Sequence, residues 1–164
     1  MRSLLTFAAL AVALIASPVL AAPALMGDLK VTVAGRDSVI LTPSDVAALP
    51  RGKATITVKG QAVVYEGAVL HGALLKAGVV SGERLMGRYL NQVVVLRAAD
   101  GFTSILSIAE TDPVYRANPV ILADTVNGKP LDVREGPYRV VVDGDLRPSR
   151  APRNVVAIEV KAGF

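Results

Sequence analysis

Apolar and polar residues alternate in several short stretches of the chain, with the period of two that is typical of half-buried β-strands. The clearest stretch is Leu29–Val33, in which Leu29, Val31 and Val33 alternate with Lys30 and Thr32. Residues 93–96 are apolar throughout, as in a strand that is buried on both faces. Further strands are predicted at residues 38–41, 54–58, 63–65, 103–106, 120–123, 138–142 and 155–160.

Two short helices interrupt these strands. Thr42 is a suitable N-cap, Pro43 suits the first helical position, and Pro50 ends the segment. In the second helix, apolar residues recur at three- and four-residue spacing over 70–77, and Gly78 provides a left-handed stop. Residues 81–90 are predicted to form a further short helix.

Two local motifs complete the prediction of secondary structure. Asp100-Gly101 indicates a two-residue turn between two strands, and Ser107 with Glu110 has the spacing of a capping box. The expected fold class is α+β, a mixed and strand-rich compact domain with short peripheral helices. The length of the chain suits one domain with a core of its own.

The first residues have the pattern of a secretory signal peptide. Arg2 precedes an apolar run over residues 4–15, and small residues lead to Ala21. We expect cleavage after Ala21, so residues 1–21 form the signal peptide and 22–164 the domain. The run is shorter than a bilayer span, although a retained anchor is the alternative interpretation. The mature protein is therefore expected to be periplasmic or secreted, without membrane insertion after signal removal.

Composition excludes several kinds of chemistry. The chain has no cysteine, so it has no disulfide framework, no thiolate nucleophile and no thiolate metal ligand. Its formal net charge is +4, but only 4% of its residues are aromatic and tryptophan is absent. Since single-stranded nucleic acids stack on aromatic side chains, nucleic-acid binding is not expected.

Several motifs in the second half resemble one known family. They are the segments at 100–107, 118–123, 127–131 and 135–142, which follow one another in the order and spacing of the sulfite-oxidase-type molybdopterin-binding domain. Gly67 and the pattern Leu74-x-x-Ala77-Gly78 extend the resemblance over nearly all of the predicted mature chain. The resemblance implies a compact mixed domain, heavy in strands, and a molybdopterin cofactor in the family's enzymes.

The sequence departs from that family at the positions that carry its chemistry. The family's enzymes present a cysteine thiolate to molybdenum after the third strand, where this chain reads Lys59-Gly60-Gln61-Ala62. Phe102 stands where tyrosine is frequent, and Glu135 where sulfite oxidases have histidine. The leader also lacks the twin arginines of proteins exported with a cofactor inserted. No cofactor is therefore expected, with molybdopterin as the alternative.

The resemblance also implies a basic phosphate-binding loop at residues 147–153. Arg150 and Arg153 match its basic positions, and Arg139 or Lys129 is placed to reinforce it. Guanidinium groups suit oxyanions because their donors form a planar fork. Arg139, Arg150 and Arg153 are thus the candidate anion or pterin-phosphate contacts. The alternative is a solvated loop whose arginines pair with Asp143 and Asp145.

The sequence offers no catalytic or metal-binding set. His71 is the only histidine and is interpreted as a boundary residue of its helix, and Asp143-Gly144-Asp145 is more typical of a turn than of a calcium site. Three hypotheses remain. The first is a periplasmic binding or interaction module, without molybdenum redox activity, for a periplasmic or membrane protein partner. The second is a molybdopterin-dependent oxidoreductase with non-cysteine metal ligation. The third is a small-anion carrier that uses the three arginines.

Overall fold

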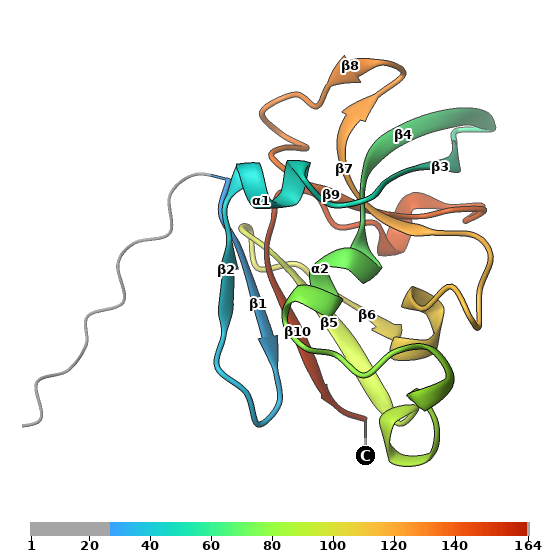
Figure 1. Cartoon of the computed structure of the whole chain (residues 1–164). Coiled ribbons are helices and arrows are strands. Elements are labelled where there is room, and N and C mark those ends of the chain that lie inside the picture. The colour runs from blue at the N-terminus through green and yellow to red at the C-terminus, as the bar shows by residue number, and fades with distance from the viewer. Residues whose placement is uncertain (1–26, 164) are drawn as a thin grey trace, which may run out of the picture.

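The computed structural model describes residues 27–163, which form two five-stranded sheets joined by short helical segments (Figure 1). The predicted signal peptide lies outside the described residues. Within them, no helix combines the length and the hydropathy needed to cross a bilayer. The strand-rich prediction is confirmed, and the described part of the chain is mostly β rather than an even mixture of helix and strand.

The first sheet, sheet A, has the strand order β2-β1-β10-β5-β6. Its only parallel pair among the described residues is β1 with β10, and the other neighbours are antiparallel. Its strands are β1 (Leu29–Val33), β2 (Val39–Leu41), β5 (Gln92–Ala98), β6 (Thr103–Ser107) and β10 (Val155–Ala162).

The second sheet, sheet B, has the order β3-β4-β7-β8, and β9 also pairs with β7. It curls, because the backbone after β9 hydrogen-bonds back to β3: Gly144 N donates to the Thr55 carbonyl at 3.0 Å. Its strands are β3 (Arg51–Val58), β4 (Gln61–Val69), β7 (Val120–Val126), β8 (Lys129–Pro130) and β9 (Arg139–Val142).

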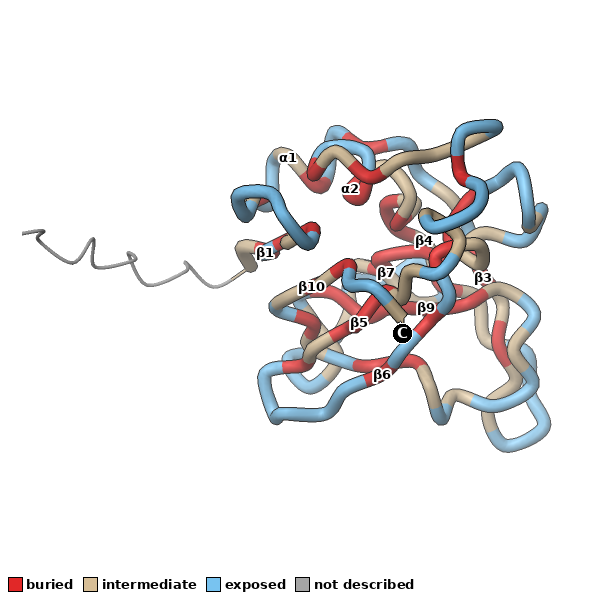
Figure 2. Tube along the Cα trace, turned by 90° about the horizontal axis from the view of Figure 1, so that it is seen from below, coloured by how far each residue is buried: buried red, intermediate tan, exposed pale blue. Residues whose placement is uncertain are grey.

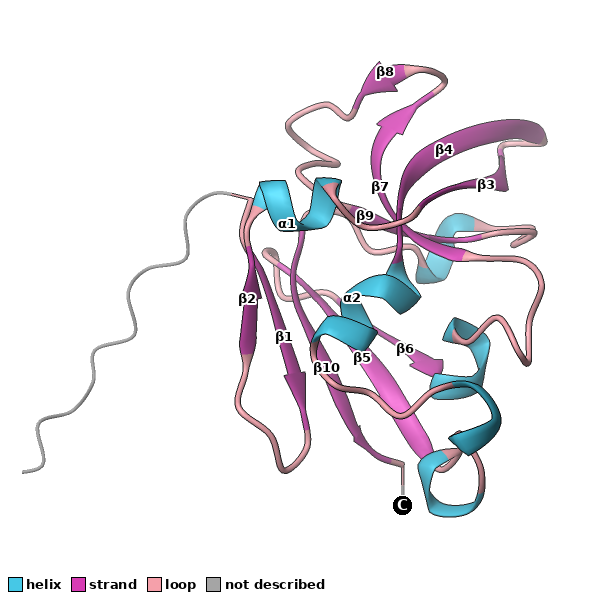
Figure 3. Cartoon of the chain, viewed as in Figure 1, coloured by secondary structure: helices cyan, strands magenta, loops and turns pink. Residues whose placement is uncertain are grey.

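The helices form where the local sequence predicts them. Helix α1 (Pro43–Ala47) begins with a capping box in which Thr42 and Asp45 exchange hydrogen bonds. Helix α2 (Leu70–Lys76) buries Leu70, Ala73 and Leu74 and is followed by Gly78 in the left-handed region. Figure 3 shows the helical segments as short connections between longer strands. The remaining ones are 3-10 turns: η1 (Gly82–Arg84), η2 (Gly87–Tyr89), η3 (Ile108–Thr111) and η4 (Pro148–Arg150).

Three local predictions need correction. Residues 81–90 form the two 3-10 turns η1 and η2 instead of one α-helix, because Gly82 and Gly87 both adopt positive φ angles that interrupt an α-helix. The β5–β6 connection covers residues 99–102, so it is longer than a two-residue turn. Strand β4 extends to both sides of the predicted 63–65, since it pairs with β3 along its whole length.

Buried residues gather along the strands, and the loops carry most of the exposed residues (Figure 2). The larger cluster joins sheet A, α2 and one face of β7 and β9, and the smaller one lies on the opposite face of sheet B. The small cluster contains Ala54, Ile56, Tyr65, Ile121, Ala123 and Val141. Because sheet B is covered on both faces, the interior positions of β9 are all buried.

Sheet A presents two separate sets of loops at its two ends. At one end, the β5–β6 loop meets the start of β10, where Ala99 N donates to the Asn154 carbonyl at 2.9 Å. At the other end, the β1–β2 turn lies near the start of β5 and the end of β10. Residues on these two loop sets are therefore separated by the length of the sheet.

One ion-pair cluster on sheet A makes stability depend on pH. Arg97 donates a 2.6 Å hydrogen bond to Glu159, which also contacts Lys161 at 2.5 Å, and together they lower the pKa of Glu159 to about 2 from 4.5. A lowered carboxyl pKa stabilises the fold above pH 4.5, and this contribution is lost as the pH falls from 4.5 towards 2. Urea unfolding of Glu159→Gln should show a shallower loss of stability over that interval than the wild type. Equal pH dependence would contradict the assignment.

Candidate functional site

The candidate site is a pocket of about 250 Å³ between the β5–β6 loop and the segment around η4. Arg139 and Arg153 contribute its basic groups, and Phe102 and Asp100 lie on the opposite loop. Pro148, Ser149, Ala151 and Pro152 complete the lining. The pocket therefore brings together the family-like 100–102 segment and the arginine-rich loop, which are far apart in sequence.

Arg139 is held at this pocket by buried contacts on sheet B. It begins β9, is 2% exposed, and its Nη1 donates to the Tyr65 hydroxyl at 2.7 Å and to Glu135 Oε1 at 2.6 Å. Its guanidinium also lies 5.0 Å from the centroid of the Tyr65 ring. Its Nε is buried and has no hydrogen-bond partner. An unpaired buried donor is costly, so the contacts with Tyr65 and Glu135 must offset this cost.

Glu135 is the counter-ion for both pocket arginines. Its Oε1 lies 2.6 Å from Arg139 Nη1 and 3.3 Å from Arg153 Nε. One carboxylate therefore faces two guanidinium groups, and Arg139, Arg153 and Glu135 together carry a charge of +1, with the Asp100 carboxylate on the opposite loop. Because Arg153 is more exposed than Arg139, with a side chain that is 57% accessible, it is the group that an incoming anion meets first.

The pKa of Tyr65, whose hydroxyl lies beside Arg139, is shifted by its surroundings. Burial raises the pKa of Tyr65, while the charge of Arg139 acts in the opposite direction. Tyr65 therefore stays protonated and accepts the Arg139 hydrogen bond as a neutral hydroxyl. It positions the guanidinium without adding a second negative charge.

Arg150 does not join the other two arginines in the pocket. It is bound by two carboxylates: its Nε and Nη2 contact Asp145 at 2.8 and 2.9 Å, and its Nη1 contacts Glu110 at 2.8 Å. The hydrogen bonds with Asp145 are the main reason why the pKa of Arg150 lies above its usual value. Its charge is compensated, so its role is to fix the loop after β9.

The ion pairs predicted for the arginine-rich loop are found for Asp145 but not for Asp143. The Asp143 carboxylate instead accepts a 2.7 Å hydrogen bond from Thr55 N, which helps to attach β3 to the segment after β9. Lys129 lies in β8 and does not contribute to the pocket lining. His71 is half-buried in α2 and its Nε2 lies 3.1 Å from Ser81 Oγ, as suits a helix-boundary residue.

Two residues of the site were not identified as such from the sequence. Tyr65 is 74 positions from Arg139, and nothing in the local pattern of β4 distinguishes it from any other buried strand residue. Glu135 was noted only as a departure from the family. Its spacing of four residues from Arg139 is a signal of an ion pair, but the segment between them is not helical.

The residues present do not fit a thiolate-bound molybdenum centre. The chain has no cysteine, and Lys59-Gly60, where the resemblance places the ligand loop, is a tight turn between β3 and β4 with both residues at positive φ. Residues 59–62 are exposed and do not line the cavities of about 580, 250 and 320 Å³. In that same range, no three metal-ligating side chains lie close enough together to hold an ion.

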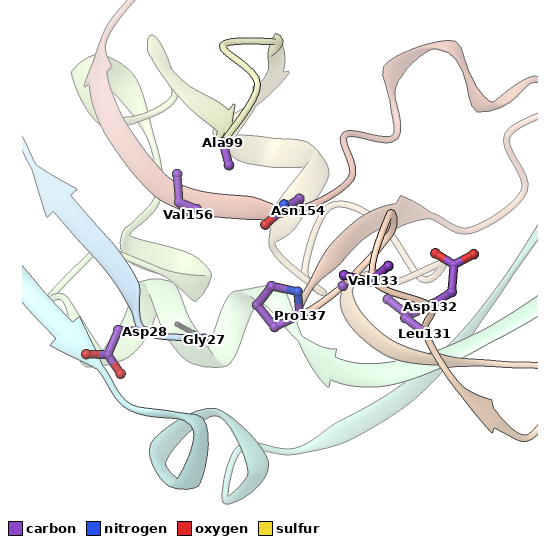
Figure 4. Close-up of a pocket in the computed structure, with 10 residues that line it drawn as sticks. Gly27, Asp28, Ala99, Leu131, Asp132, Val133, Pro137, Asn154 and Val156 are labelled. Atoms are coloured by element: carbon purple, nitrogen blue, oxygen red, sulfur yellow. The ribbon is translucent and has the colours of Figure 1, made fainter. Parts of the chain in front are cut away.

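A larger cavity of about 580 Å³ lies next to this site (Figure 4). Ala99, Asn154 and Val156 form one side, and Pro137 with residues 131–133 forms another. Its described lining is mainly apolar and includes no basic residue. The smaller pocket, where two guanidinium groups converge, is therefore the better candidate for recognition of a charged ligand.

Comparison with known proteins supports the fold. No family model matches the chain, and no match is found among curated proteins. Among solved structures, the chain is similar to the sulfane dehydrogenase SoxCD from Paracoccus pantotrophus, with a TM-score of 0.61 and 16% identity. The match covers 82% of this chain and 38% of that one, so this chain spans well under half the length of its structural neighbour.

At this level of identity the similarity shows the fold alone. The comparison supports the sulfite-oxidase-like fold that the sequence resemblance implies, without assigning the chain to that family. The ligand that this chain binds therefore depends on the residues of its own pocket.

Proposed function

We propose that this protein is a small extracytoplasmic binding module with a sulfite-oxidase-like fold, which recognises a small anion and does not carry out molybdenum redox chemistry. The observation that carries the proposal is the presence of two arginines, Arg139 and Arg153, in the lining of one pocket. The periplasmic or secreted location rests on the predicted signal peptide. A periplasmic or membrane protein partner stays a prediction from the sequence.

The pocket suits a compact oxyanion or carboxylate. Arg153 is accessible to solvent, Arg139 is held in place by Tyr65 and Glu135, and Ser149 belongs to the same lining. A guanidinium that is already oriented loses little freedom when it binds, which favours oxygen pairs over spherical ions. Phe102 is 45% exposed on the opposite wall and offers an apolar surface to the rest of the ligand.

Sulfate is a direct probe of this pocket. In an NMR titration at constant ionic strength, sulfate should cause saturable shifts at the amides of residues 100–102, 149–151 and 153. Arg153→Gln should weaken the binding about tenfold, because one charge-assisted hydrogen bond is lost. Arg153 is exposed enough for this change to leave the fold intact.

Arg84→Gln is the matched control, because it removes one exposed positive charge at the opposite end of sheet A. It should leave sulfate binding unchanged. Equal weakening in both variants would show a general charge effect, and the absence of saturable shifts in the wild type would refute the anion pocket.

The alternative of a molybdopterin-dependent oxidoreductase makes a different prediction. It requires molybdenum and pterin in stoichiometric amounts in protein purified from its native compartment. Metal mass spectrometry and fluorescence of the released pterin measure both, and we expect neither. Stoichiometric amounts of the two would refute the non-redox part of the proposal while leaving the sulfate titration to be judged separately.

A further inference from the structure

A second basic region lies at the opposite end of sheet A from the candidate site. Arg36 lies in the β1–β2 turn, and Arg84 and Arg88 lie in η1 and η2. Figure 1 shows this turn and the 82–89 segment at the lower end of the molecule, where the chain also ends. We call Arg36, Arg84, Arg88, Met86 and Tyr89 the basic end.

The three arginines of the basic end are not compensated. Arg51, Arg97, Arg116, Arg139, Arg150 and Arg153 all form ion pairs, whereas Arg36, Arg84 and Arg88 form none with other described residues. Asp37 and Glu83 are neighbours in sequence, but they too form no ion pair with these arginines. All three guanidinium groups belong to exposed residues. With Asp37 and Glu83 counted, this region carries a formal charge of +1, and its three guanidinium groups are in contact with no carboxylate of the described residues.

The three arginines of the basic end lie around one tyrosine, Tyr89. Arg88 Nη2 donates a 3.1 Å hydrogen bond to the Tyr89 hydroxyl, and its guanidinium carbon lies 5.0 Å from the centroid of the Tyr89 ring. The pKa of Tyr89 is lowered, first by this hydrogen bond and by the charge of Arg88, and also by the charges of Arg36 and Arg84. All three arginines thus lie near enough to Tyr89 to lower the pKa of its hydroxyl.

An exposed apolar residue lies between two of these charges. Met86 is 61% exposed, whereas its neighbour Leu85 is fully buried. The Tyr115 hydroxyl donates to the Leu85 carbonyl, so the backbone of this loop is anchored to the protein. The methionine is therefore held outward, with an arginine two residues away on each side.

The basic end also contains a hollow. A cavity of about 320 Å³ lies between the β1–β2 turn and the residues that follow α2. Arg36 and Tyr89 form part of its wall, together with Val33, Val79 and Gln92. This volume suits a small polar group such as the glycerophosphate head of a lipid.

We propose that the basic end docks the protein on an anionic phospholipid bilayer. The arginines contact headgroup phosphates, Met86 enters the boundary between headgroups and acyl chains, and the hollow between Arg36 and Tyr89 receives one headgroup. Cations beside an exposed apolar side chain are the combination that binds membrane interfaces. This attachment is peripheral and uses no spanning segment. It is independent of the anion pocket at the other end of sheet A.

Vesicle sedimentation tests the proposal, with vesicles of phosphatidylcholine alone or mixed with phosphatidylglycerol. The protein is purified from the extracytoplasmic fraction, and its mass must confirm that the leader is absent, because residues 4–15 would bind lipid by themselves. The wild type should bind only the vesicles with phosphatidylglycerol and be released by high salt. Arg84→Gln with Arg88→Gln should weaken binding roughly thirtyfold, from about fivefold per arginine. Met86→Ser should weaken it without changing its salt dependence.

Arg134→Gln with Arg147→Gln is the matched control. Both residues are exposed and form no ion pair with other described residues, so this double variant has the same net charge as the first. It should bind nearly as the wild type does. Equal loss in both double variants, or no binding of the wild type, would overturn the proposal; the second result would favour an acidic protein as the partner. Complete displacement by soluble glycerol phosphate would also overturn it, because the ligand would then be a free phosphoryl compound.

Discussion

Gly67→Ala is expected to destabilise the protein by about 3 kcal/mol, close to the upper end of the cost of overpacking a core. A Cβ at this position would lie 2.0 Å from the Leu122 carbonyl oxygen and 2.5 Å from the Ala123 Cα. Both atoms belong to the backbone of β7, so no side-chain rotation relieves the contact. Gly67 lies where the register of β4 against β7 shifts, and the two strands would have to separate there. Urea unfolding of the purified variant measures the change.

Gly72→Ala is the matched control for this prediction. Gly72 lies inside α2, and its added Cβ would meet the Leu49 side chain at 3.3 Å. Alanine gains about 1 kcal/mol over glycine in a helix, which offsets the mild crowding. We expect a change within about 1 kcal/mol in either direction. If the two variants lost equal stability, the close approach of β4 and β7 would not be the cause.

Arg139→Met is expected to cost about 3 kcal/mol and to abolish sulfate binding. The substitution preserves much of the apolar volume. It leaves Arg153 as the only ion-pair partner of Glu135 and removes the hydrogen bond that Arg139 donates to the Tyr65 hydroxyl. Removing the buried partner leaves Glu135 with only the longer contact to the exposed Arg153, which accounts for the size of the effect. Unfolding in urea and the sulfate titration measure the two consequences.

A double variant separates the ion pair from simple packing. Glu135→Gln combined with Arg139→Met leaves no uncompensated carboxylate in the site. The double variant should be more stable than the sum of the two single effects predicts, by about 1 to 2 kcal/mol. Strict additivity would mean that the 2.6 Å contact between Glu135 and Arg139 contributes no coupling, and the electrostatic description of the pocket would be wrong.

Different variants test the anion pocket and the basic end. Arg153→Gln should alter sulfate binding but not vesicle binding, and Arg84→Gln with Arg88→Gln should do the reverse. A module that holds a small anion at one end of sheet A and rests on a membrane at the other would keep its ligand site facing away from the lipid.

Secondary structure was predictable wherever one short segment contains the whole cause. Thr42, Pro43 and Asp45 form the cap of α1 among themselves, and Gly78 ends α2 because it alone adopts the left-handed conformation there without strain. The alternation in β1 is likewise local. The prediction of a helix over 81–90 is wrong for the converse reason. Leu85 is buried in a core cluster built from distant parts of the chain, and Gly82 and Gly87 allow the backbone conformation that places it there.

The candidate site was predictable only in part. The sequence grouped Arg139, Arg150 and Arg153 as anion contacts because all three are near in sequence or in the family pattern, and two of them, Arg139 and Arg153, line one pocket. Tertiary structure separates Arg150 from the other two, because Glu110, which is 40 positions away, lies beside it and binds its guanidinium. Likewise, only the pairing of β4 with β7, and of β7 with β9, brings Tyr65 to Arg139.

By itself, the sequence determined the strand-rich character of this protein, the start of α1, the end of α2 and the absence of any thiolate ligand, because each follows from residue types or from neighbours in the chain. Tertiary structure decided which charges are neutralised and which stay available. Arginines that look alike in sequence differ in the carboxylates placed beside them by strands from distant parts of the chain. Coulomb interactions depend on those distances in space, so the ion pairs of Arg139 and Arg150, and the lack of one for Arg36, Arg84 and Arg88 among the described residues, emerge only in the fold.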